Sequence, residues 1–214
     1  MLLKSLVRTT TGLGALGGIT MAPRPERIFG ANNRVRVVVC GLHGHGKDHQ
    51  SAFSHLSQGE IAALCDVDEN LLRKRQGEVG GNPRTLVDTR ELLEDKSIDA
   101  ISIATPNHWR SLIAISACQS GKDVYVEKPC SHNLREGQQL VRAAQKYNRI
   151  VQHGTQIRFA PAIQEAVKAL HEGGIGEVYL ARGLCLKWRD TIGHAPVEPV
   201  PAGVHLPSGP ALHP

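Results

Sequence analysis

Short apolar runs and longer amphipathic segments follow one another along residues 34–154. The apolar runs are rich in β-branched residues, as in VRVVV at 35–39, and this composition suits strands that are buried on both faces of a parallel sheet. The pattern predicts six strands, which cover residues 35–40, 61–65, 85–87, 99–104, 123–129 and 149–154.

The segments between these runs are predicted to be helices, because their apolar residues recur at helical spacing. They cover residues 47–58, 69–79, 91–95, 109–120 and 134–147. Within the fourth of these helices, we expect Leu112, Ile115 and Ala117 to face the core. Strands that alternate with helices in this way imply an α/β fold with a doubly wound parallel sheet and right-handed crossovers.

The pattern changes after residue 154. Residues 160–173 are predicted to form a further amphipathic helix, and Glu177–Leu186 a strand, the first of a different sheet. No periodic apolar run follows Trp188, and six of the twelve prolines lie between Pro196 and Pro214. Such a tail buries little apolar surface. We therefore expect residues 156–214 to be the incomplete start of a second domain.

Residues 1–33 lack the pattern of a folded core. Lys4 and Arg8 precede the weakly apolar run TTTGLGALGGITMA, a layout that is typical of an export leader. The alternatives are a disordered tail and a mis-assigned start site. A leader predicts an exported or periplasmic protein, and its absence a cytoplasmic one. The apolar run is too short and too rich in glycine to span a membrane.

Composition narrows the classes of function. The 214 residues carry a net charge of +5 and only 4% aromatic residues, and the basic residues are scattered, which argues against nucleic-acid binding. The five cysteines are odd in number and form no C-x-x-C motif, which argues against a disulfide framework and a thiolate zinc site. Cys40 and Cys65 end apolar runs and are predicted to be buried thiols.

A glycine-rich turn, GLHGHG at 41–46, follows the first strand and precedes a helix. This combination forms the phosphate site of dinucleotide-binding proteins, where the backbone approaches the pyrophosphate and the helix N-terminus supplies N–H groups. The turn contains Gly41, Gly44 and Gly46, and His43 stands where the usual G-x-G-x-x-G spacing has its second glycine. Because glycine turns after strands are common, the motif alone is a weak signal.

Asp66 ends the second strand, twenty residues after Gly46. A carboxylate at this place accepts hydrogen bonds from both hydroxyls of an adenosine ribose and repels a 2′-phosphate, so it favours NAD over NADP. The alternative is helix capping, since Asp66 and Asp68 both precede the helical segment ENLLRKR.

Two polar motifs follow the fourth and fifth strands, TPNH at 105–108 and EKP at 127–129. Ligands of open α/β sheets bind at the carboxyl ends of the strands. Each motif alone is compatible with an ordinary turn. Together they point to the same crevice as Gly41 and Asp66.

The motifs GLHGHG, CDVD, ATPNHW, VEKP and QHGTQIR resemble, in order and spacing, those of the Gfo/Idh/MocA oxidoreductases over residues 34–188. The resemblance implies an NAD(P)-binding Rossmann domain at 34–155 and an α/β open-sheet substrate domain, whose incomplete start is 156–214. It implies hydride transfer between NAD(P) and a hydroxyl carbon of a sugar or cyclitol, with Lys128 as the catalytic residue and Pro129 in a cis peptide bond. The residues that it implies at the cofactor are Gly41, His43, Gly44, Gly46, Asp66, Thr105, Asn107, His108, Glu127, Lys128 and Gln156.

In this family the proton-transfer histidine belongs to the second domain, and the sequence after PAGVH at 201–205 does not continue the pattern of the relatives. We therefore expect a truncated or frame-shifted chain that is inactive alone, and a non-catalytic NAD-binding fragment is the alternative function. The resemblance implies a small-molecule substrate and no membrane span, and it leaves a homo-oligomer open.

His43 and His45 also resemble the metal-binding histidine pair of amidohydrolase barrels. That class needs a closed barrel and further ligands on later strands, so a metal-dependent hydrolase is a remote alternative. We expect no metal site. His45 and His49 are expected close to phosphate or solvent, and His153 at a strand end.

Overall fold

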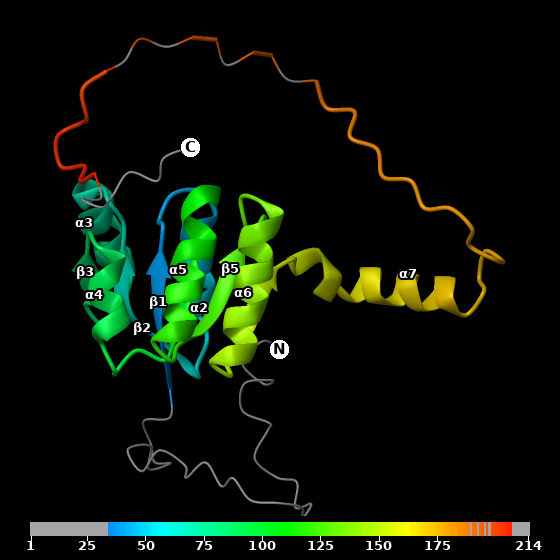
Figure 1. Ribbon diagram of the computed structural model, residues 1–214, viewed down its shortest axis with the longest axis horizontal. Coiled ribbons are helices and arrows are strands. Elements are labelled where there is room, and N and C mark those ends of the chain that lie inside the picture. Colours follow the sequence, from blue (N-terminus) through cyan, green and yellow to red (C-terminus); the bar gives the residue numbers. More distant parts are fainter. Residues whose placement is uncertain (1–33, 189, 192, 195, 197, 207–214) are drawn as a thin grey trace, which may run out of the picture.

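The computed structural model describes residues 34–188, 190, 191, 193, 194, 196 and 198–206 (Figure 1). The expected leader at 1–33 lies outside these residues. The described chain consists of β1 (Val35–Cys40), α2 (His45–Ser54), β2 (Gly59–Cys65), α3 (Glu69–Glu78), β3 (Arg84–Leu86), α4 (Thr89–Glu94), β4 (Ala100–Ile103), α5 (Asn107–Gln119), β5 (Asp123–Glu127), α6 (Leu134–Lys146), β6 (Val151–Gly154), η1 (Gln156–Phe159) and α7 (Pro161–His171).

The six strands form one sheet in the order β3-β2-β1-β4-β5-β6. Every neighbouring pair is parallel. This is the strand order of the Rossmann fold, in which the chain reverses its direction of travel across the sheet between β1 and β4. The doubly wound α/β fold that the sequence predicts is therefore confirmed.

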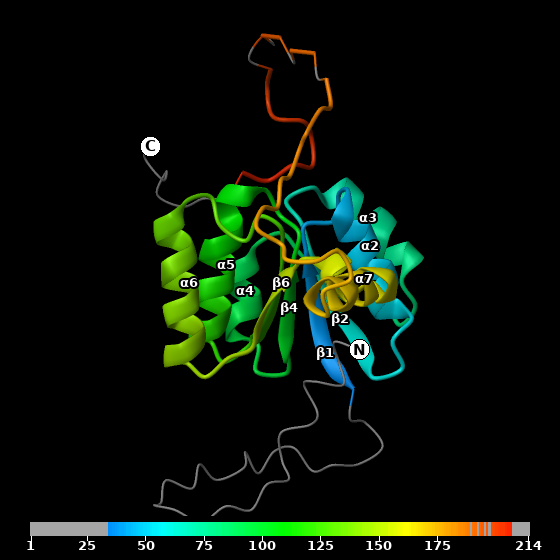
Figure 2. The ribbon, with the colours of Figure 1, turned by 90° about the vertical axis from the view of Figure 1, so that its right-hand side faces the viewer.

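Helices cover both faces of the sheet, with α4, α5 and α6 on one side and α2 and α3 on the other (Figure 2). Val38 enters the core cluster on the first side, together with Ile101 and Val126. Its neighbour Val39 enters the cluster on the second side with Leu64. Consecutive side chains of a strand point to opposite faces, so an unbroken apolar run supplies both clusters. No helix in the described ranges is long and apolar enough to cross a bilayer.

Two cysteines lie side by side at the carboxyl ends of β1 and β2. Cys40 pairs with Cys65 across β1 and β2, and both are buried, as predicted. The hydrogen bond that the Cys40 thiol donates to Cys65, together with burial, raises the pKa of Cys40 well above its ordinary value. The thiols are free rather than joined in a disulfide.

Beyond β6 the chain leaves the sheet and forms η1 and then α7, which confirms the helix predicted there (Figure 1). The strand predicted at Glu177–Leu186 is wrong, because these residues have no regular structure. Leu180, Leu184 and Leu186 are 62%, 71% and 88% exposed. A strand needs a hydrogen-bonded neighbour, and no residue that the structure describes pairs with this segment. The predicted domain boundary at residue 155 stays a prediction.

Candidate functional site

The turn after β1 requires glycine at two positions. Gly41 has a φ of +81°, and a Cβ atom on it would lie 2.7 Å from the backbone nitrogen of Thr105. At Gly46, in the first turn of α2, a Cβ atom would lie 1.8 Å from the carbonyl oxygen of Gly41. Both glycines therefore allow α2 to approach the ends of β1 and β4 closely, as a dinucleotide phosphate site requires.

The N-terminus of α2 is open to solvent. Its N-cap, Gly44, has a φ of +49°, and no side chain caps the helix. His43, in the position of the missing glycine, is exposed. The N–H groups of Gly46 and Lys47 donate within the turn, to the carbonyls of His43 and Gly44, and the helix end still carries a partial positive charge. These features fit a pyrophosphate group.

Asp66 lies on the same edge of the sheet, just after β2. Its Oδ2 accepts a hydrogen bond from the N–H of Leu42 at 2.7 Å, and its Oδ1 accepts one from the N–H of Asp68 at 3.1 Å. Each carboxylate oxygen can accept a second bond, so the group still has acceptor capacity for a ligand. The cap of α3 is Asp68, which accepts from the N–H groups of Asn70 and Leu71. The capping alternative thus applies to Asp68 and not to Asp66.

The TPNH motif joins β4 to α5. The hydroxyl oxygen of Thr105 is buried and has no hydrogen-bond partner within the described part of the chain. Asn107 and His108 are exposed in the first turn of α5, which no side chain caps. A buried hydroxyl without a partner, beside a second open helix N-terminus, fits the polar end of a bound ligand.

Glu127 ends β5 as a buried carboxylate that is only 1% exposed. Its Oε1 accepts a hydrogen bond from Nε2 of Gln156 and lies 3.4 Å from Nε2 of His49. Its Oε2 accepts a bond from the backbone N–H of Lys128 at 2.9 Å. Glu127 therefore holds the EKP turn and Gln156 from inside the fold, rather than presenting itself to a ligand.

His49 is buried on the inner face of α2, so the expectation that it lies near phosphate or solvent is wrong. It is 6% exposed, and its Nδ1 lies 2.9 Å from Oγ of Ser102. Its ring meets Tyr125 edge to face, with the centroids 5.1 Å apart. Because an ionised carboxylate only accepts hydrogen bonds, Nε2 donates to Glu127, and Nδ1 accepts from the Ser102 hydroxyl. This tautomer is neutral.

Burial lowers the pKa of His49 below its ordinary value of 6.5, although the hydrogen bond to Glu127 acts in the opposite direction. Burial raises the pKa of Glu127, but the hydrogen bonds from Gln156, the Lys128 N–H and His49 outweigh it and bring that pKa below its ordinary 4.5. At neutral pH a neutral imidazole therefore lies beside an ionised carboxylate.

Lys128 and Arg110 complete this edge. Lys128 is exposed, and its peptide bond to Pro129 is cis, as the resemblance implies. Arg110 of α5 donates to the carbonyl of Thr105 at 2.7 Å and to that of Pro129 at 2.9 Å. It thus joins the turn after β4 to the turn after β5. Sequence reasoning missed Arg110, although its position three residues after Asn107 places it on the first turn of the same helix.

His43 and His45 contact different carboxylates and do not converge. Nε2 of His43 lies 4.0 Å from Asp68, and Nδ1 of His45 lies 3.1 Å from Asp48. Over the ranges that the structure describes, no three side chains gather in a way that could hold a metal ion. The sheet is open, with β3 and β6 at its edges. The barrel that the hydrolase alternative needs is therefore absent from the described fold.

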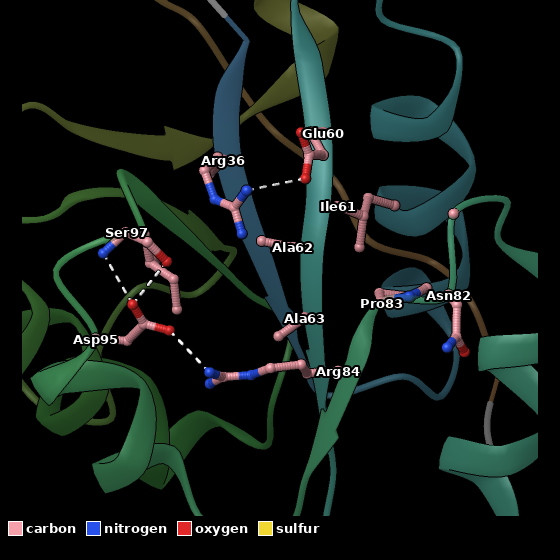
Figure 3. Close-up of a pocket in the computed structure, with 12 residues that line it drawn as sticks. Arg36, Glu60, Ile61, Ala62, Ala63, Asn82, Pro83, Arg84, Asp95 and Ser97 are labelled. Atoms are coloured by element: carbon pink, nitrogen blue, oxygen red, sulfur yellow. Dashed lines mark hydrogen bonds and ion pairs between the residues drawn. The ribbon is translucent and has the colours of Figure 1, made fainter. Parts of the chain in front are cut away.

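A separate pocket of about 240 Å³ lies toward the amino-terminal ends of β1 and β2 (Figure 3). Arg36 and Glu60 form an ion pair there at 3.1 Å, and Arg84 pairs with Asp95 at 3.1 Å. None of the predicted site residues lines this pocket. Its charged groups pair with one another, so it is not the candidate site.

Comparison with known proteins identifies the family. Residues 35–155 match the Gfo/Idh/MocA family, described as an oxidoreductase family with an NAD-binding Rossmann fold. This chain belongs to the Gfo/Idh/MocA family. The Gfo/Idh/MocA chain is 30% identical over 148 residues to inositol 2-dehydrogenase 1 of Saccharopolyspora erythraea, a match that covers 68% of this chain and 44% of the relative. It is 31% identical over 148 residues to D-apiose dehydrogenase of Paraburkholderia graminis, a match that covers 68% of this chain and 38% of the relative.

A solved relative shows the same fold. The WlbA dehydrogenase of Bordetella pertussis, in complex with NADH and UDP-GlcNAcA, aligns with a TM-score of 0.63 at 25% identity, over 68% of this chain and 44% of that one. The Gfo/Idh/MocA chain thus spans less than half the length of the relatives it matches. What it contains is the NAD-binding oxidoreductase domain of the family.

Proposed function

We propose that this Gfo/Idh/MocA chain binds NAD along the carboxyl edge of its sheet, as the cofactor half of a sugar or cyclitol dehydrogenase. One observation carries the proposal: Asp66 is tied through Leu42 to the glycine turn, next to the uncapped N-terminus of α2. Asp66, proposed to bind the ribose, and the N-terminus of α2, proposed to bind the phosphates, thus lie on one edge of the sheet. The names of the relatives, inositol and D-apiose dehydrogenases, support a polyol substrate.

The residues at this edge divide between the two ends of the dinucleotide. Asp66 would accept hydrogen bonds from the adenosine ribose. The turn that would face the pyrophosphate consists of Gly41, His43, Gly44 and Gly46. The nicotinamide end would be lined by Thr105, Asn107, His108, Lys128 and Gln156, and buried Glu127 would hold Lys128 and Gln156 in place from inside the fold.

When bound, NAD supplies a hydride acceptor. In the proposal Lys128 is the catalytic residue, because its exposed ammonium group can hold a substrate hydroxyl by hydrogen bonds. Glu127 is not the base, since Gln156, the Lys128 N–H and His49 already engage its oxygens. It positions Lys128 instead.

The preference for NAD is tested by calorimetric titration of the 214-residue polypeptide with NAD and with NADP. We expect NAD to bind more tightly, because the Asp66 carboxylate repels a 2′-phosphate. Asp66→Asn removes the charge at nearly constant size and should weaken NAD by about 1.5–3 kcal/mol, the value of a hydrogen bond to a charged group. Glu165→Gln, on exposed α7, is the matched control and should change neither affinity. Equal binding of both nucleotides by the unaltered chain would remove Asp66 from the ribose site.

The role of Lys128 is tested in a chimaera that joins this domain to the second domain of an inositol dehydrogenase. Lys128→Met should lower the rate of NADH formation about 100-fold or more, the contribution of a positioned proton-transfer or hydrogen-bonding group, while NAD affinity changes little. Lys74→Met, on the exposed side of α3, is the control. If the Lys128 variant keeps its turnover, another residue is the catalytic group. NAD binding without NADH formation from any sugar or cyclitol would favour the non-catalytic alternative.

A further inference from the structure

Residues 201–206, here called the strap, return to the Rossmann fold and lie against the N-terminal end of α3 (Figure 1). Val204 forms an antiparallel bridge with Asp68. The N–H of His205 donates to the carbonyl of Val67 at 2.8 Å, and the N–H of Glu69 donates to the carbonyl of Gly203 at 2.9 Å. The strap thus joins two parts of the chain that are more than 130 residues apart, as the separation of 136 between Glu69 and His205 shows.

The sequence of the strap specifies its conformation. The N–H of Val204 donates to the carbonyl of Pro201 at 3.1 Å, which closes a β-turn with Gly203 as its third residue. Gly203 has a φ of +82°, and a Cβ atom on it would lie 2.9 Å from the side-chain amide nitrogen, Nδ2, of Asn70. A turn of this type needs glycine at that place.

Side chains add two contacts to those of the backbone. Nε2 of His205 lies 2.7 Å from Oε1 of Glu69. The side-chain amide of Asn70 donates to the carbonyl of Ala202 at 3.2 Å. Together with the two backbone hydrogen bonds to Val67 and Glu69, these interactions fix one conformation of a segment that has no apolar periodicity. The tail after Trp188, which is expected to bury little apolar surface, is thus held by hydrogen bonds at the strap.

The strap lies next to Asp66, the residue proposed to select NAD over NADP. Val67 and Asp68, which it holds, directly follow Asp66, and Asp66 itself accepts a bond from Asp68. Val67 is 37% exposed, and the strap holds its carbonyl through the N–H of His205. Because an adenine ring has apolar faces and lies beside its ribose, Val67 offers the kind of surface that it would contact.

We propose that the strap fixes the adenosine end of the NAD site, a role that rests on the proposed function. Adenosine held by Asp66 lies against Val67, and the hydrogen bonds of the strap keep the loop at 66–69 in its binding conformation. The competing role is a purely structural one, in which Gly203 only caps α3.

The test compares two glycines with nearly the same positive φ angle. Gly203→Val strains the turn of the strap and clashes with Asn70. Gly176→Val carries a similar strain, at a φ of +80°, but has nothing within 4 Å of its Cβ position and lies far along the chain from the strap. The affinities of the 214-residue polypeptide for NAD, AMP and nicotinamide mononucleotide are measured by calorimetry, and the melting temperature is recorded for each variant.

We expect Gly203→Val to raise the dissociation constants of NAD and AMP by the same factor, about three- to tenfold, the value of one or two lost hydrogen bonds. Binding of nicotinamide mononucleotide, and every affinity of Gly176→Val, should be unchanged. If Gly203→Val does not fold, His205→Ala, which removes one exposed contact, replaces it with the same expected direction.

Two outcomes would overturn the inference in different ways. If the unaltered chain binds NAD while the strap variant melts at a lower temperature but keeps its affinity for AMP, the strap only caps α3, and the proposed function stands. If the unaltered chain binds neither NAD nor AMP, the proposed function fails, and the role of the strap fails with it.

Discussion

At the scale of single residues, the sequence predicts the polar side chains at strand ends better than the buried polar side chains that support them. Asp66 and Lys128 follow apolar runs, so the edge on which they lie can be read from the pattern. The burial of His49 could have been inferred too, because it follows Gly46 by three residues and shares its face of α2. Its partner could not, since Glu127 lies 78 residues further along the chain and on a different element.

The glycine turn gives a prediction at this scale. Gly46→Ala places a Cβ atom 1.8 Å from the carbonyl oxygen of Gly41, so α2 must move away from the sheet. We expect a loss of about 1–3 kcal/mol in the free energy of unfolding, the cost of overpacking. Gly77→Ala, in α3 with nothing within 4 Å of its Cβ position, should instead stabilise by about 0.5–1 kcal/mol through helix propensity. Urea unfolding of both variants measures the difference, and equal stabilities would contradict the close approach.

At the scale of elements, the strands and helices of the Rossmann fold are predictable because each has its own period. The inward face of a helix is less so. Leu112 is expected in the core but is 46% exposed, whereas Ala114 and Cys118 are fully buried. Small residues let α5 approach the sheet closely, so they set its orientation in place of the larger leucine. The strand expected at 177–186 fails because apolar alternation does not supply a neighbour for pairing.

The burial of His49 between α2 and the sheet makes the free energy of unfolding depend on pH. An unfolded His49 gains a proton near its ordinary pKa of 6.5, whereas the folded ring, with its lower pKa, stays neutral. The unfolded state therefore binds more protons, and the free energy of unfolding decreases as the pH falls below 6.5. Glu127 adds a further loss at lower pH, as the pH falls below 4.5 and through its depressed folded pKa.

We expect His49→Gln to flatten the part of this pH dependence that begins at 6.5, because glutamine can donate to Glu127 but does not titrate. Urea unfolding between about pH 5 and 8, the range over which histidines titrate, provides the measurement. His132→Gln, at an exposed loop position, should leave the slope as it is. Parallel curves for the His49 variant and the unaltered chain would contradict this, because they would show that the pKa of His49 is the same in the folded and unfolded states.

At the scale of the whole molecule, a doubly wound parallel sheet with right-handed crossovers follows from the alternation of strands and helices. The order of the strands, β3-β2-β1-β4-β5-β6, is seen only in the structure. The family follows from motifs that all fall on one edge, and the match over residues 35–155 confirms it. The strap does not follow, because it is held largely by backbone hydrogen bonds, and the side chains that add to them, Asn70 and His205, belong to no apolar pattern. Contacts of this kind leave little trace in a hydrophobic pattern.

The neighbouring thiols of Cys40 and Cys65, at the ends of β1 and β2, make the separation of these two strands measurable. A thiolate is the reactive form of cysteine, and burial with a raised pKa makes it scarce at Cys40. Exposed Cys185 should therefore react with iodoacetamide first, and Cys40 and Cys65 only when β1 and β2 separate. Mass spectrometry of timed samples should show the two buried sites reacting together, and more slowly when NAD is bound. Labelling of Cys40 as fast as Cys185 would contradict this packing. The delay between the labelling of Cys185 and that of Cys40 and Cys65 then measures how long β1 and β2 stay paired.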